Sequence, residues 1–247
     1  MGQETEVHIF QKRAASYDFL VKLWKEVSSS SIAARGRFTV ALSGGKTPGD
    51  FFTRLSEKPY LSWDKTYIFQ VDERFVSPAD QASNLFLIRE TLTIRISLPD
   101  NNIHSITTEG IQPEESAKDY ERELRRFFHN HETLPRLDLI MLGIGDDSHT
   151  ASLFPGSIHL HETKRLVVPV VAKRFPLERI SLTLPVINNA RLTVFLATGE
   201  KKASVIRDIL EKDSLLPAAL VRPVAGSLVF VLDERVASLL SKTIPDA

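Results

Sequence analysis

The sequence predicts a three-layer α/β/α fold in which helices cover both faces of a mostly parallel central sheet. Short apolar, strand-like runs alternate with helix-like runs along most of the chain, and this alternation is typical of parallel sheets. Several strand-like runs are apolar throughout instead of at every second residue, which indicates burial on both faces. The chain has 247 residues without an evident repeat or linker, so we expect one domain over residues 1–247.

The first element is a strand over residues 6–10. The next predicted element is a helix, because four apolar residues then recur at helical spacing and form one face. These residues are Leu20, Leu23, Trp24 and Val27.

A second strand over 37–42 leads into a Gly-rich turn and another helix. Thr47 is suited to cap that helix and Pro48 to be its first residue. A third strand over 66–71 is followed by a helix over 84–92.

The second half of the chain continues this alternation with a charged helix over 113–131 and a strand over 137–143. Further strands are expected at 165–170, 179–185, 191–198 and 227–232, with a helix over 200–210 and a short C-terminal helix.

Composition excludes several classes of function. Lys+Arg and Asp+Glu both number 31, so no global charge attracts nucleic acid or an acidic membrane. There is no cysteine, which excludes disulfides, thiolate nucleophiles and Cys-ligated metals. The N-terminus lacks the pattern of a secretory signal, and no apolar run approaches the ~18 residues of a membrane span. We therefore expect a cytoplasmic protein without nucleic-acid or membrane partners, either a monomer or a weak dimer.

Three strand ends carry polar clusters, at 43–48, 72–74 and 143–149. In open α/β sheets, ligands bind beyond the carboxyl ends of the strands. The sequence therefore predicts one shared pocket built from these three segments.

The first cluster consists of Ser43, Gly44, Gly45, Lys46 and Thr47. Its backbone N–H groups can face an anion at a helix start, and the glycines allow close approach. It is not a Walker A loop, which requires G-x-x-x-x-G-K-[ST]. The alternative is a Gly-rich turn with a surface lysine.

The second cluster places Asp72 and Arg74 two residues apart. The guanidinium can grip a phosphate, and the carboxylate can hold a sugar hydroxyl or orient another side chain. The alternative is a structural ion pair. Asn84 adds an amide downstream, for which the alternative is a helix cap.

The third cluster is the most specific. Gly143 and Gly145 permit a tight turn, and Asp146, Asp147 and His149 lie within four residues. An imidazole oriented by a carboxylate is the usual equipment for general acid–base catalysis. The alternative is a helix N-terminus whose acids complement the helix dipole.

The other histidines are weaker candidates. His129 and His131 lie in the charged helical region, and His159 and His161 in a predicted loop without a third metal ligand. We interpret them as surface residues and expect no metal. Ser152, like the serine of the first cluster, does not lie in G-x-S-x-G, so an activated water is preferred to a serine nucleophile.

Taken together, these segments resemble the 6-phosphogluconolactonases. "ALSGGKTP", "VDERFV" followed by "SN", "GIGDDSHTASLFPG", "RISLTLPVINNA" and "FLATGEKKA" occur in the order typical of that family, over nearly the whole chain. The resemblance implies the fold shared with glucosamine-6-phosphate deaminases and ribose-5-phosphate isomerases. It also implies hydrolysis of 6-phospho-D-glucono-1,5-lactone to 6-phospho-D-gluconate in the oxidative pentose phosphate pathway, with no cofactor.

The resemblance further implies roles for individual residues. His149 matches the general base that deprotonates water and later helps to protonate the ring oxygen, and Asp147 orients either the histidine or the turn. Asp72 contacts the substrate or supports the base, while Arg74 binds anionic charge. The implied substrate-binding residues also include Ser43, Gly44, Gly45, Lys46, Thr47, Asn84, Arg179 and Lys202.

The chain departs from the family at Ser148, where D-G-H is usual. If the turn needs a positive φ there, serine costs about 1–3 kcal/mol. Two alternatives remain. An amino-sugar-phosphate isomerase or deaminase usually continues "IAFNEP" where this chain has "TASLFP". A non-catalytic sugar-phosphate sensor would carry a helix-turn-helix segment, and this N-terminus begins with a strand.

Overall fold

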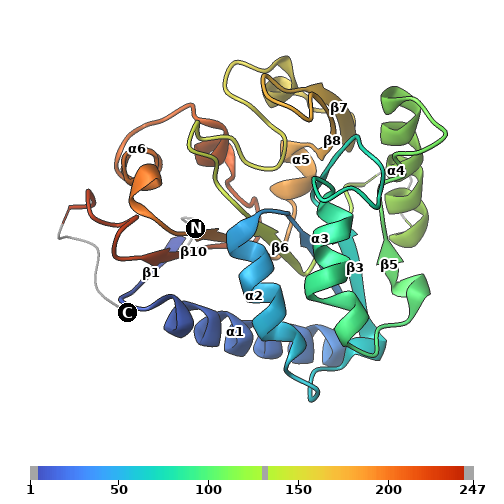
Figure 1. The fold of residues 1–247 in the computed structure, drawn as a ribbon, viewed down its shortest axis with the longest axis horizontal. Helices are drawn as coiled ribbons and strands as arrows, with labels where there is room; N and C mark the ends of the chain where they lie inside the picture. Colours follow the sequence, from blue (N-terminus) through green and yellow to red (C-terminus); the bar gives the residue numbers. More distant parts are fainter. Residues whose placement is uncertain (1–4, 130–132, 242–247) are drawn as a thin grey trace.

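The computed structural model describes residues 5–129 and 133–241 of the chain. Seven strands form a central sheet in the order β1-β10-β9-β6-β2-β3-β5, and every pairing in it is parallel (Figure 1). The predicted parallel sheet is confirmed. The strands are β1 (Thr5–Phe10), β2 (Phe38–Leu42), β3 (Thr66–Gln70), β5 (Ile103–His104), β6 (Leu139–Leu142), β9 (Leu192–Ala197) and β10 (Ser227–Asp233).

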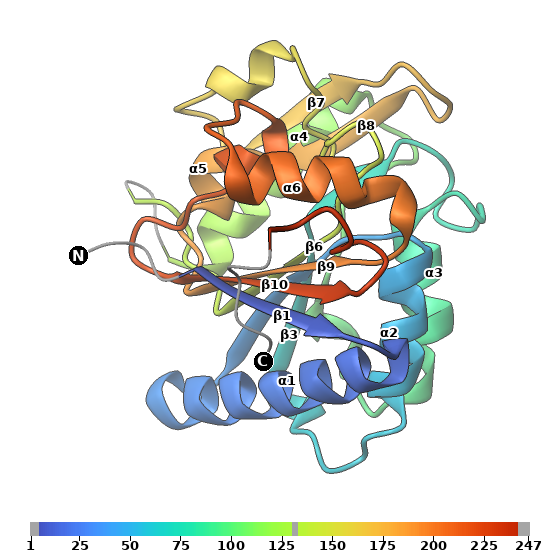
Figure 2. The same ribbon diagram turned by 90° about the vertical axis from the view of Figure 1, so that its left-hand side faces the viewer.

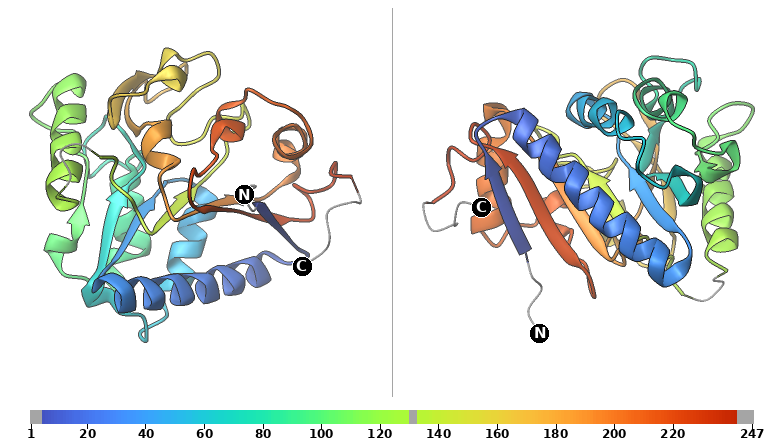
Figure 3. Two further views of the ribbon diagram at one scale, coloured as in Figure 1. Left: turned by 180° about the vertical axis from the view of Figure 1, so that it is seen from behind. Right: turned by 90° about the horizontal axis from the view of Figure 1, so that it is seen from below.

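Helices cover both faces of this sheet, which confirms the three layers (Figure 2). One face carries α1 (Arg13–Arg35), α2 (Lys46–Ser56) and α3 (Asn84–Thr91); the other carries α4 (Pro113–Phe127), α5 (Leu184–Ile187) and α6 (Ala203–Glu211). The long helix α1 lies across β1 and β10 (Figure 3). Its predicted apolar face is confirmed, since Leu20 and Trp24 are buried there.

Both faces of the inner strands are buried, as their uniform apolar pattern predicts. In β6, Leu139 and Met141 pack into the cluster beneath α1, α2 and α3. Ile140 and Leu142 of the same strand pack into the cluster on the opposite face. The sheet is therefore a rigid platform whose carboxyl edge carries the polar segments.

A second, three-stranded antiparallel sheet was not expected. It consists of β4 (Asp72–Arg74), β8 (Glu178–Leu182) and β7 (Val167–Val171), in the order β4-β8-β7. The segment 72–74 is thus a strand and not only the polar end of one. Val71 separates it from β3, and Leu182 N donates to the Val71 carbonyl (2.9 Å). Such a short polar strand has no periodicity to reveal it.

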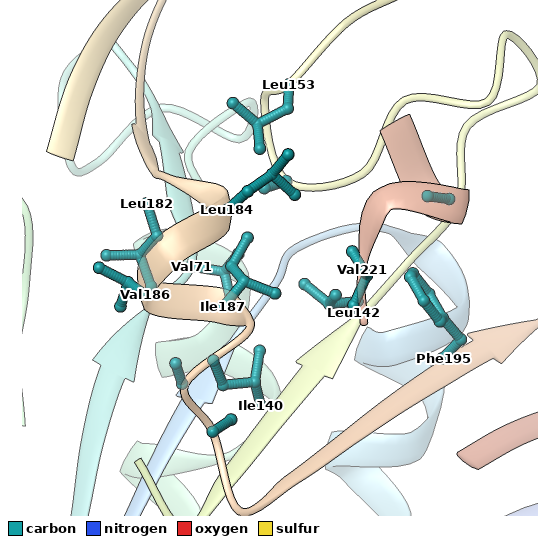
Figure 4. Packing of buried hydrophobic residues seen from close by; sticks show 14 of the residues in the cluster. Val71, Ile140, Leu142, Leu153, Leu182, Leu184, Val186, Ile187, Phe195 and Val221 are labelled. Carbon is teal, nitrogen blue, oxygen red and sulfur yellow. The ribbon is translucent and has the colours of Figure 1, made fainter. Parts of the chain in front are cut away.

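Helix α5 lies between the three-stranded sheet β4-β8-β7, called the small sheet below, and the central sheet (Figure 4). Leu184, Val186 and Ile187 pack in one apolar cluster with Val71 and Leu182. This packing fixes β4 and β8 relative to the ends of the parallel strands.

The predicted cap of α2 is wrong. The helix begins at Lys46, and Gly45 occupies the N-cap position with φ 113° and no side-chain cap. Thr47 lies inside the first turn, where its hydroxyl bonds that of Thr198 (3.0 Å). Glycine at the cap leaves the first N–H groups of the helix without a side-chain acceptor.

Further differences occur at chain segments outside the sheet. The charged helix ends at Phe127, so His129 lies beyond it, and His131 lies outside the described residues. A short 3-10 helix, Ile158–His161, replaces the predicted loop. After β10 the chain forms turns as far as Ser241, so the expected C-terminal helix is not found in the part that the structure describes.

Within the described ranges, no helix is long and apolar enough to cross a membrane. The same ranges contain no group of three side chains suited to hold a metal ion.

Candidate active site

A cavity of about 230 Å³ lies beyond the carboxyl ends of β2, β6 and β9. It brings together eleven of the twelve predicted site residues, and the twelfth, Asp147, lines an adjoining cavity and bonds His149. The eleven are Ser43, Gly44, Gly45, Lys46, Thr47, Asp72, Arg74, Asn84, His149, Arg179 and Lys202.

The histidine lies on a tight turn and not on a helix. Gly145 N donates to the His149 carbonyl (2.8 Å), and Ser148 N donates to the Gly145 carbonyl (2.9 Å). No helix follows the turn directly, so the helix-dipole interpretation of the two acids is wrong. A Cβ on Gly145 would lie 2.1 Å from His149 Nδ1. Only glycine leaves room for the imidazole here.

Asp147 and His149 form a close pair, with 2.5 Å between Oδ1 and Nδ1. A carboxylate only accepts hydrogen bonds, so Nδ1 carries the proton, and in the neutral imidazole Nε2 then keeps a free lone pair. Partial burial raises the pKa of Asp147, but the hydrogen bond and charge of His149 outweigh it and lower that pKa overall. The acid therefore stays ionised and holds the imidazole in one tautomer.

Ser148 has φ 69°, in the left-handed region that favours glycine. The family's glycine at this position therefore has a physical reason, and serine adopts the strained angle. Ser148 is buried, and its hydroxyl bonds the Asp147 carbonyl. The turn thus keeps its conformation at the expense of local strain.

Two arginines face each other across the small sheet. Arg74 of β4 is directly opposite Arg179 of β8, and like charges at such positions destabilise a sheet. Burial and then the charge of Arg74 lower the pKa of Arg179. Within the described chain neither forms an ion pair, so the predicted alternative of an Asp72–Arg74 ion pair is not seen. Two adjacent unpaired guanidiniums suit an anion.

Arg74 is held by a hydrogen bond from Nη1 to the Ala82 carbonyl (2.7 Å), and its buried Nε has no partner in the described chain. Lys202 adds a third cation. Burial lowers its pKa, while the charge of Asp146 acts in the opposite direction. Lys46 is exposed at the first position of α2. Four cations on four separate segments therefore line the cavity.

Asp72 is buried beside the turn that carries His149. Its Oδ2 accepts a hydrogen bond from Ser152 Oγ (2.6 Å), and Ser152 is fully buried. The serine that we considered as a nucleophile is instead a donor that ties Asp72 to the chain three residues after His149. Nothing in the local sequence signals this pairing, because 80 residues separate the two.

Asn84 is not the helix cap. Ser83 caps α3 by accepting from Phe86 N (3.2 Å), which leaves the Asn84 amide to the cavity. Its Nδ2 donates to the Asp72 carbonyl (2.8 Å), whereas its Oδ1 is buried and has no partner among the described residues. Ser43 Oγ is likewise buried, and no described residue bonds it. Such orphaned polar atoms in a cavity are expected to meet a polar ligand.

Fold and site together define a class: an α/β protein with an acid–base pair at the mouth of a pocket that suits a phosphorylated, hydroxyl-rich small molecule. Comparison with known proteins gives the family. Residues 11–230 match the model of the glucosamine-6-phosphate isomerases/6-phosphogluconolactonases. The chain belongs to this family.

Individual relatives agree with this assignment. A 6-phosphogluconolactonase of Rattus norvegicus is 40% identical over 84% of this chain and 82% of its own. The structure of 6-phosphogluconolactonase from Trypanosoma cruzi has a TM-score of 0.88 at 25% identity, covering 98% of both chains. A monomeric glucosamine-6-phosphate deaminase shares the fold, with a TM-score of 0.81 at 18% identity over 95% of this chain and 99% of its own. The predicted relation between these folds is confirmed.

Proposed function

We propose that this chain hydrolyses 6-phospho-D-glucono-1,5-lactone to 6-phospho-D-gluconate, the lactone-opening step of the oxidative pentose phosphate pathway. The relatives that match most of its length are 6-phosphogluconolactonases. The observation that carries the mechanism is the Asp147–His149 pair beside a cavity lined by arginine and lysine. We also propose that the reaction takes place in the cytoplasm, because the relatives that match this chain are metabolic enzymes.

In this mechanism His149 Nε2 accepts a proton from water as the water oxygen attacks the lactone carbonyl carbon. Asp147 holds Nδ1–H and stabilises the imidazolium that forms. The tetrahedral intermediate then collapses, the bond between the carbonyl carbon and the ring oxygen breaks, and the imidazolium returns the proton to that oxygen. The product acid ionises in solution, so His149 begins and ends neutral.

The remaining residues bind and orient the substrate. Arg74, Arg179 and Lys202 offer positive charge to the phosphate, and the uncapped start of α2 adds backbone N–H groups. Asn84 Oδ1 and Ser43 Oγ supply unpartnered polar atoms for sugar hydroxyls. Asp72, held by Ser152, contacts the substrate or supports the base.

The test is the initial rate of hydrolysis of freshly generated lactone, with the spontaneous rate subtracted. His149→Ala should reduce kcat by about 10²-fold or more if the imidazole is the general base. The matched control is His8→Ala. His8 also bonds a carboxylate two residues away, Glu6 (3.1 Å), but lies in β1. The His8→Ala variant should retain the wild-type rate of lactone hydrolysis.

A wild-type protein that does not accelerate the reaction would refute the proposal. Glucosamine 6-phosphate should be assayed in parallel, since turnover of that substrate alone would assign the chain to the deaminase branch of the family. A His149→Ala variant with near-wild-type kcat would retain the function and overturn the general-base role.

A further inference from the structure

Glu73 is the least exposed carboxylate in the small sheet, and no role in the site has been given to it. It lies in β4 between Asp72 and Arg74 and is 1% exposed. Successive side chains of a strand point to opposite faces, so Glu73 points away from the face that Asp72 and Arg74 share. It does not line the cavity.

Five donors surround this carboxylate. Oε1 accepts from the backbone N–H groups of Arg74 (2.7 Å) and Asn84 (2.6 Å). Oε2 accepts from Leu85 N (2.7 Å), Ser83 Oγ (3.0 Å) and Gln70 Nε2 (2.7 Å). Burial raises the pKa of Glu73, and these backbone bonds oppose the rise. In the described chain, neutral donors and the N-terminus of α3 contact the carboxylate, and no cation forms an ion pair with it.

Two of the five donors belong to residues that line the cavity, Arg74 and Asn84. Glu73 therefore fixes the backbone of β4 to the first turn of α3 at the two residues whose side chains line the cavity. The Asn84 amide then bonds the Asp72 carbonyl and points Oδ1 toward Gly44, where a Cβ would lie 1.8 Å away. The orientation of that unpartnered oxygen depends on the backbone position that Glu73 holds.

We propose that Glu73 is a positioning residue that acts through Asn84 and Arg74: it holds the amide oxygen and the guanidinium in the geometry that binds the sugar phosphate. This inference rests on the proposed function for the identity of the substrate. If the inference is correct, loss of the Glu73 carboxylate weakens substrate binding. A buried carboxylate with only a structural role would affect folding stability and leave substrate binding unchanged.

The test is a double-mutant cycle of Glu73→Gln and Asn84→Ala, measured as kcat/KM. Glutamine keeps the shape but offers an NH₂ group where only acceptors fit. Each single variant should lower kcat/KM by about 10-fold or more, mainly through KM. Because Glu73 acts through Asn84, the double variant should fall clearly short of the product of the two single effects.

Asp138→Asn is the matched control. Asp138 is also a buried carboxylate, 3% exposed, that accepts from Thr39 N (2.9 Å), Thr39 Oγ1 (2.9 Å) and Arg35 (2.7 Å). It precedes β6 at the opposite end of the strands. Its variant should lose stability without a change in KM, and its effect should be additive with that of Asn84→Ala.

The same four proteins of the cycle should be titrated with 6-phosphogluconate by calorimetry. If the wild type hydrolyses the lactone but Glu73→Gln behaves like Asp138→Asn, the inference fails and the function stands. If the wild type binds 6-phosphogluconate without hydrolysing the lactone, the proposed function is refuted. The same double-mutant cycle, calculated from the Kd values in place of kcat/KM, still tests the inference.

A wild type that does neither refutes both. Should Glu73→Gln not fold, Ser83→Ala removes one of the five bonds and should raise KM by a smaller factor. An unchanged KM in that variant overturns the inference.

Discussion

Gly145→Ala should disable the proposed catalytic base without unfolding the protein. The new Cβ would lie 2.1 Å from His149 Nδ1, 2.2 Å from Cε1 and 2.7 Å from Asp147 Oδ1. Ordinary contact begins near 3.4 Å, so the ring must withdraw by about 1.3 Å. The Asp147–His149 bond of 2.5 Å does not survive such a displacement.

We expect Gly145→Ala to lower kcat strongly and the free energy of unfolding only slightly. A displacement of about 1 Å can cost 10²-fold in rate, and loss of a positioned base costs about 10²–10⁴-fold. The His149 side chain is 31% exposed and Asp147 59%, so the pair contributes at most about 1 kcal/mol to folding. We expect kcat to fall at least 10²-fold while Tm changes by less than about 4 °C.

The assay is steady-state hydrolysis of the lactone together with thermal unfolding and the NMR signal of the His149 imidazole. Gly143→Ala is the matched substitution in the same turn, because no atom of the described residues, apart from its chain neighbours, lies within 4 Å of its added Cβ. It should leave the imidazole signal in place and affect KM at most. If Gly145→Ala keeps kcat within about threefold of wild type, the reasoning about the Asp147–His149 geometry is wrong.

Three other predictions follow from the same geometry. Ser148→Gly should raise the free energy of unfolding by about 0.5–1 kcal/mol, because relief of the left-handed strain exceeds the entropy cost of glycine; a lower Tm would show that the hydroxyl bond to Asp147 dominates. Ser152→Ala leaves a buried oxygen of Asp72 unpaired, so urea denaturation should report a loss of about 1–3 kcal/mol, and kcat/KM should fall with it. Since burial lowers the pKa of Lys202 below the ordinary 10.5, its charge is lost at a lower pH than in free lysine. Calorimetry should therefore show that the affinity for 6-phosphogluconate falls as the pH rises, and that this fall occurs already below pH 10.5. In Lys202→Arg the fall should move to higher pH. If it does not move, Lys202 is not the group responsible.

The sequence predicts the parts of the site that follow directly from strand ends. The segments around Ser43 and His149 end buried apolar strands of the parallel sheet, and that sheet brings their carboxyl ends to one edge. Residue type then indicates the chemistry. The backbone angle at Ser148 also follows from the sequence. The D-G-H pattern of the resembled family has glycine at this position, which suits the positive φ that the structure has.

What the sequence does not reveal depends on contacts between distant segments. Arg179 looks like a surface cation until the antiparallel pairing of β4 and β8 sets it opposite Arg74. Ser152 and Asp72 lie 80 residues apart, and their bond follows from the packing of the turn against the small sheet. Glu73 lies inside the "VDERFV" segment, but that pattern does not indicate the proposed role, since the role depends on five donors that only the fold assembles.

Charged side chains are paired at one end of the parallel strands and unpaired at the other. At the amino end, Asp138 is buried against Arg35 (2.7 Å) and Arg191 (3.3 Å), so cations and carboxylate are paired. At the carboxyl end, Arg74 and Arg179 face each other without a carboxylate partner in the described chain. Folding alone would favour pairing at both ends, since unpaired like charges destabilise. The repulsion at the carboxyl end is therefore best explained by a ligand that supplies the missing negative charge, and a phosphate does so.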